Sequence, residues 1–110
     1  MAMTYNVNIS ISDGHNTMAI TDNPTLSGDD NLKDVITFIL KISKNQILDK
    51  FPTNQWIYQW IISSELDGSL ESFFTAFNVK GDRNLMSALL NGGKVSDLPE
   101  REYVLAFDGY

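Results

Sequence analysis

The sequence predicts an α+β fold, in which a small antiparallel sheet is packed by about four helices. Apolar and polar residues alternate strictly near the N-terminus, which is typical of a strand. Apolar residues recur at helical spacing through the middle of the chain, and a continuous apolar run near the C-terminus indicates a last strand. The chain of 110 residues has the commonest length of one domain. We therefore expect a single domain over residues 1–110.

The sheet is expected to consist of an N-terminal hairpin and a C-terminal strand. Every second residue from 5 to 12 is apolar, so one face of this strand is predicted to be buried. Asp-Gly at residues 13–14 supplies the positive φ angles of a tight turn, and residues 17–21 return as the second strand. Residues 101–108 are apolar on both faces, so we expect this strand to pair with the hairpin and to be more deeply buried.

Two helices are predicted with clear ends. A long one covers residues 30–49, with Asp30 or Asn31 as its cap and with Phe38 counted in its apolar stripe. A short one covers residues 82–90, capped by its first residue and ended by the glycines that follow it.

The segment between these helices is rich in aromatic residues. Residues 55–62 contain Trp56, Tyr58 and Trp60 among isoleucines, a pattern compatible with a helix or a strand. We favour a helix, because residues 69–77 just downstream form a clear amphipathic one. A helix that is apolar around most of its circumference is either central to the core or in contact with a partner.

Net charge and composition limit the classes of partner that the chain can bind. A formal net charge of −6 opposes binding to nucleic acid or to an anionic membrane, and suits a basic protein surface, including one that normally holds nucleic acid. The chain has no cysteine, so disulfides and thiolate metal sites are excluded. No signal peptide and no apolar run of about 20 residues is present. These features predict a cytoplasmic protein.

Catalytic and metal-binding patterns are missing from the sequence. His15 is the one histidine and falls in the predicted turn, without a nucleophile to activate. Asp22, Asp29, Asp30 and Asp34 do not match the spacing of a calcium loop. The glycines fit neither phosphate-binding motif. We therefore expect no catalytic residues, no metal and no cofactor.

The remaining candidates are residues that contact a protein partner, either as aromatic anchors or as acidic groups. They are Trp56, Tyr58, Trp60, Glu100, Glu102, Asp108 and Tyr110.

The function predicted by elimination is that of a small acidic, non-catalytic binding protein of the inhibitor or immunity type, which masks a basic surface of a macromolecular partner. One alternative is a self-associating accessory protein of the phage or mobile-element type, whose apolar surface is buried in a homo-oligomer. A second alternative is a small enzyme that uses only carboxyl and hydroxyl groups.

Overall fold

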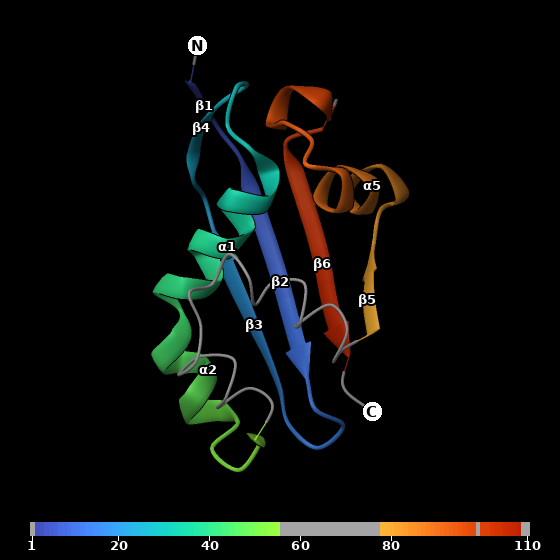
Figure 1. Ribbon diagram of the computed structural model, residues 1–110. Helices are drawn as coiled ribbons and strands as arrows, with labels where there is room; N and C mark the ends of the chain where they lie inside the picture. Colours follow the sequence, from blue (N-terminus) through green and yellow to red (C-terminus); the bar gives the residue numbers. More distant parts are fainter. Residues whose placement is uncertain (1, 56–77, 99, 109–110) are drawn as a thin grey trace.

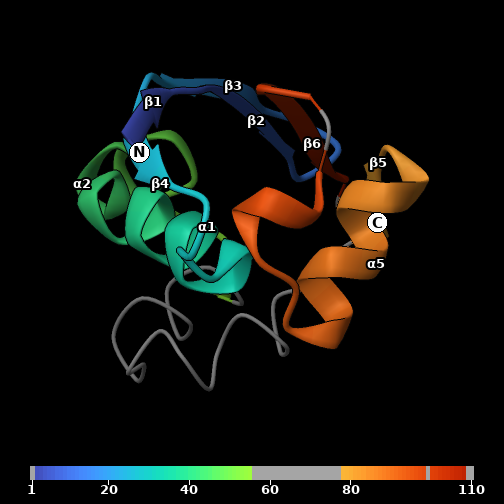
Figure 2. The same cartoon turned by 90° about the horizontal axis from the view of Figure 1, so that it is seen from above.

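The computed structural model describes residues 2–55, 78–98 and 100–108. These residues form a layer of strands and a layer of helices on one of its faces (Figure 1, Figure 2). The strands are β1 (Ala2–Thr4), β2 (Asn6–Ser12), β3 (Thr17–Asp22), β4 (Thr25–Ser27), β5 (Asn78–Gly81) and β6 (Glu102–Asp108). The helices are α1 (Leu32–Ile42), α2 (Lys44–Lys50) and α5 (Arg83–Asn91), with the short 3-10 helix η1 (Val95–Asp97).

The N-terminal hairpin is present as predicted. Strands β2 and β3 pair antiparallel from Val7–Asp22 to Ser12–Thr17. Gly14 adopts a φ of 91° in the connecting turn, a conformation that glycine reaches without a steric penalty. Beyond the other end of the hairpin, β1 and β4 pair antiparallel as a separate two-stranded sheet.

The predicted sheet and helix count are wrong, although the class remains α+β. The main sheet has four strands in the order β3-β2-β6-β5 and is mixed, because β6 runs parallel to β2. Three α-helices and six strands occur in the described residues, rather than about four helices around a small antiparallel sheet. The direction of β6 depends on the path of the long connection from the hairpin, which local residue patterns do not encode.

Strand β6 pairs with the hairpin as expected, but it is buried on one face only, although its residues are apolar on both faces. Tyr103, Leu105 and Phe107 point into the core and are at most 2% exposed. Val104, on the opposite face, is 56% exposed. The described helices cover only one face of the sheet (Figure 2), so the apolar outward residues of β6 remain in contact with solvent.

The single long helix expected over residues 30–49 is two helices. Asn31 caps α1, since its Oδ1 accepts a hydrogen bond from the Asp34 amide at 3.2 Å. The helix ends at Ser43, whose φ of −98° and ψ of 5° leave the helical region. Serine is a weak helix former, and α2 begins directly after it and buries Ile47.

Helix α5 follows the prediction at both ends. Asp82 caps its first turn and Gly92 ends it in the left-handed conformation, with a φ of 72°. Strand β5, which precedes it, was not predicted. The elements predicted at residues 55–62 and 69–77 lie, from residue 56 onward, outside the described residues. Among the helices that are described, none has the length and apolar character needed to cross a membrane.

Candidate functional site: an acidic pocket beside strand β6

A pocket of about 240 Å³ lies beside the first residues of β6. Strand β5 pairs with β6 only as far as Gly81, opposite Leu105. The chain then enters α5, so residues 102–104 have no strand partner on that side in the described structure. The pocket is lined by residues of α5 and its cap, of the loop before β6, and of β6 itself: Asp82, Asn84, Leu85, Leu98, Glu100, Glu102, Tyr103 and Val104.

The pocket combines a buried apolar floor with an exposed acidic rim. Leu85 and Tyr103 are each 2% exposed and form the floor. Asp82, Glu100 and Glu102 are exposed around it. The charged groups that line the pocket are therefore all carboxylates, so the pocket attracts cations and repels anions.

The position of Asp82 is set by the helix that it caps. Its Oδ1 accepts hydrogen bonds from the amides of Asn84 at 2.9 Å and Leu85 at 3.3 Å. These two bonds satisfy amide groups that the first turn of a helix leaves unpaired. The same bonds hold the carboxylate at the wall of the pocket.

The loop that carries Glu100 is anchored to the rest of the protein. The amide of Val95 donates to the Asp30 carbonyl at 2.9 Å, and the amide of Ser96 donates to the Gly28 carbonyl at 3.0 Å. At the end of the loop, the Arg101 carbonyl accepts a hydrogen bond from the amide of Asn6 at 2.8 Å. Backbone contacts on both sides of Glu100 thus fix where the rim of the pocket lies.

Tyr103 provides a neutral floor to the pocket. Its ring stacks on that of Tyr5, with centroids 5.6 Å apart. Its hydroxyl is buried and has no hydrogen-bond partner among the described residues. Burial, with a smaller contribution from Tyr5, raises the pKa of Tyr103 to about 12. The phenol therefore stays protonated at neutral pH and adds no charge to the site.

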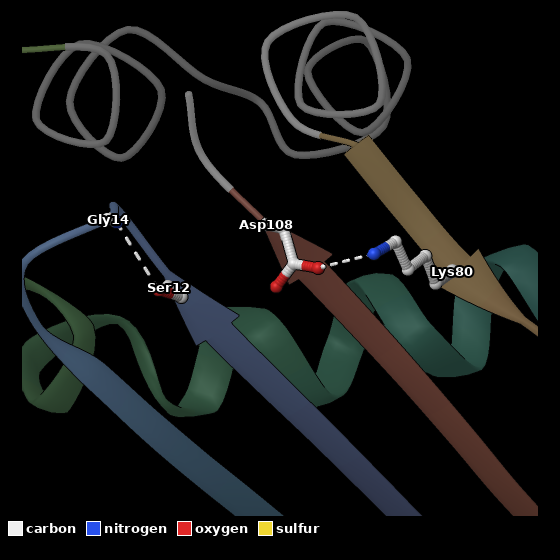
Figure 3. A network of polar contacts seen from close by, with 4 residues as sticks. All are labelled: Ser12, Gly14, Lys80 and Asp108. Atoms are coloured by element: carbon white, nitrogen blue, oxygen red, sulfur yellow. Dashed lines mark hydrogen bonds and ion pairs between the residues drawn. The ribbon is translucent and has the colours of Figure 1, made fainter.

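Of the three candidate contact residues that the structure describes, it brings two together. Glu100 and Glu102 share the pocket. Asp108 lies at the far end of β6, about 20 Å from Glu102 along the strand. Its carboxylate pairs with Lys80 at 3.4 Å, near the turn where the Gly14 amide donates to the Ser12 hydroxyl (Figure 3). Trp56, Tyr58, Trp60 and Tyr110 lie outside the described residues.

Polar residues of the hairpin turn and of the segment before α1 make local contacts outside the pocket. The amide of Asn16 donates to the Asp13 carboxylate at 2.7 Å, and this bond is the main reason why the pKa of Asp13 lies below its usual range. His15 sits exposed in the same turn. Asp30 accepts a hydrogen bond from the Ser27 amide at 2.8 Å. Within the described ranges, no three His, Cys, Asp or Glu residues are placed to hold a metal ion.

Sequence reasoning did not identify six of the eight lining residues as site residues: Asp82, Asn84, Leu85, Leu98, Tyr103 and Val104. Asp82 was recognised as a helix cap, and Leu85 as part of an apolar stripe. No sequence signal placed them next to Glu100, because this contact depends on where β5 ends and α5 begins.

Fold and pocket together define a small α+β domain with an acidic, apolar-floored pocket beside a free strand edge. No protein-family model, no curated protein and no solved structure matches the chain.

Proposed function

We propose that the protein is a non-catalytic binding protein that masks a basic surface of another protein. The acidic pocket beside β6 is the observation that carries this proposal. It is formed by residues from two separate parts of the chain, residues 82–85 and residues 98–104. Two of the lining residues, Glu100 and Glu102, were expected to contact a partner from the sequence alone.

The pocket suits one lysine or arginine side chain. Its volume of about 240 Å³ is below the range of typical small-molecule sites, roughly 300 to 1,000 Å³. Leu85, Leu98 and Val104 offer apolar contacts to an aliphatic stem. The rim carboxylates provide charge-assisted hydrogen bonds to a cationic head group.

Net charge favours the same kind of partner. The total of −6 repels nucleic acid and anionic lipid but accelerates encounter with a basic protein, for example one that itself binds nucleic acid. The proposal is therefore an inhibitor or immunity type of action, in which the basic surface is covered. We also propose that the protein acts in the cytoplasm, because a chain without cysteine suits a reducing compartment.

The experiment is capture of partners from host lysate on the immobilised full chain, at low and at high salt. The test variant is Glu100→Gln/Glu102→Gln. The matched control is Asp29→Asn/Asp49→Asn, which removes the same charge from exposed positions outside the pocket. We expect wild type and control to retain a basic protein at low salt only, and the test variant to lose most of it.

Equal retention by the test variant and the control would contradict a role of the pocket. Retention of an acidic protein, or of nothing at either salt concentration, would refute the proposed function. Circular dichroism of both variants shows whether a loss of binding reflects a loss of folding.

A second candidate function, self-association, is favoured by strand β3. This strand lies at the edge of the sheet, and its only charged residue is Asp22 at its end. Edge strands of soluble proteins usually carry lysine, proline or a bulge that prevents pairing with another copy. Sedimentation equilibrium tests this candidate: a homo-oligomer that dissociates on Ala19→Lys supports it, and a monomer at all concentrations refutes it.

A further inference from the structure

A groove of about 550 Å³ runs beside α1, separate from the acidic pocket. On one side it is lined by α1, and on the other by the segment that joins β3 to β4 and by β4 itself, where Pro24 and Leu26 line it. None of its lining residues also lines the pocket beside β6.

Two large apolar side chains of α1 are left exposed along this groove. Phe38 is 61% exposed and Ile42 is 58% exposed. The sequence had placed Phe38 in the core stripe, and this assignment is wrong. At about 100° per residue, Phe38 lies roughly 120° around the helix from the buried Leu32, beside rather than within the stripe that packs on the sheet.

The exposed pair forms part of a row along the helix. Asp34, Phe38 and Ile42 are four residues apart, so neighbouring side chains lie about 6 Å from one another on one side of α1. Val35 and Ile39 line the groove next to this row and are buried. The groove therefore has an apolar floor and, at Phe38 and Ile42, an exposed apolar edge along about 6 Å of helix.

The charges of the groove are all negative. Asp22, Asp30 and Asp34 are its charged lining residues. An apolar strip with carboxylates beside it is complementary to a helix that has an apolar face and flanking lysine or arginine side chains. Apolar anchors four residues apart on such a helix match the spacing of Phe38 and Ile42.

We infer that this groove binds an amphipathic, basic α-helix of the partner. The inference rests on the proposed function and deepens it, because it names the structural class of the basic surface that is covered. Phe38 and Ile42 insert between the apolar side chains of the bound helix, while Asp22, Asp30 and Asp34 pair with its basic flanks.

The test uses the full chain and a fluorescein-labelled synthetic peptide of about 14 residues, with leucines on one helical face and lysines on the other. Binding is followed by fluorescence anisotropy. We expect Phe38→Ala and Ile42→Ala each to weaken binding about tenfold. Leu90→Ala is the matched control: Leu90 is 65% exposed on α5, outside the groove, and its loss is expected to change binding less than about twofold.

Charge is tested separately. Asp34→Asn is expected to weaken binding about threefold, whereas Asp49→Asn, an exposed carboxylate outside the groove, leaves it unchanged. A peptide in which glutamates replace the lysines is expected to bind at least about tenfold more weakly. Equal binding of the two peptides would overturn the assignment of a basic partner helix. Thermal unfolding of each variant confirms that it is folded.

Three other results would overturn the inference. If the lysine peptide binds but Phe38→Ala and Ile42→Ala do not affect it, the groove is not the docking site, and the proposed function stands. If the peptide does not bind at all, the groove inference fails, while the lysate capture with Glu100→Gln/Glu102→Gln still tests the proposed function. If wild type forms a dimer that Phe38→Ala converts to a monomer, the groove belongs to a contact between copies.

Discussion

The buried hydroxyl of Tyr103 gives the sharpest prediction about stability. The side chain is 2% exposed, and its hydroxyl has no hydrogen-bond partner among the described residues. A buried polar group without a partner costs about 1 to 3 kcal/mol. Tyr103→Phe keeps the ring that stacks on Tyr5 and removes only the hydroxyl. We therefore expect the variant to gain about 1 kcal/mol in free energy of unfolding at neutral pH.

The same substitution changes the response to alkaline pH. The pKa of Tyr103 is raised to about 12 in the folded protein, mainly by burial, against about 10 in an unfolded chain. At a pH between these two pKa values, the unfolded chain has released the phenolic proton and the folded protein has kept it. The folded state then binds more protons, so the free energy of unfolding falls as the pH rises. At pH 11 this loss is on the order of 1 kcal/mol, and it is absent in Tyr103→Phe, which has no phenol to titrate.

The assay is urea denaturation of wild type and Tyr103→Phe, followed by circular dichroism at neutral pH and at about pH 11. Other tyrosines and the lysines titrate in both proteins, so the difference between the two isolates Tyr103. We expect the stability advantage of the variant to grow by on the order of 1 kcal/mol at the higher pH. A variant that is less stable at neutral pH, or a difference that does not change with pH, would refute the reasoning.

Substitutions at three further positions test the fold. Asp82→Ala should lower the free energy of unfolding by about 1 kcal/mol, because two amides of the first turn of α5 lose their acceptor. Urea denaturation that shows no loss of stability would argue against this cap. Gly92 has a φ of 72°, a region that asparagine tolerates better than alanine. We therefore expect Gly92→Ala to lower the free energy of unfolding by about 1 kcal/mol and Gly92→Asn to lower it less. Thermal melts that rank the two variants equally would contradict this. Phe107→Ala should lower the free energy of unfolding by about 3 to 5 kcal/mol, because Phe107 is fully buried. A loss below about 1 kcal/mol in the same melts would show that the core collapses around the cavity.

The sequence by itself determined the elements whose causes are local. The alternation of residues 5–12 and the Asp-Gly turn specify the hairpin, because side chains of a strand alternate faces and glycine reaches positive φ freely. Asp82 and Gly92 specify the two ends of α5 through capping. The mix of acidic and aromatic residues over 100–110 predicted Glu100 and Glu102 as contact residues, and their contact with a partner stays a prediction.

The tertiary structure alone decided how distant parts of the chain meet. Strand β6 is parallel to β2 because of the route of the long connection, which no local pattern records. Strand β5 ends opposite Leu105, and that end point opens the acidic pocket. Phe38 fits the apolar pattern of its helix, yet it is exposed, because burial depends on which elements pack against each side of α1. Local propensity specifies helices and strands, whereas strand direction, pockets and exposed surfaces depend on contacts between residues far apart in sequence.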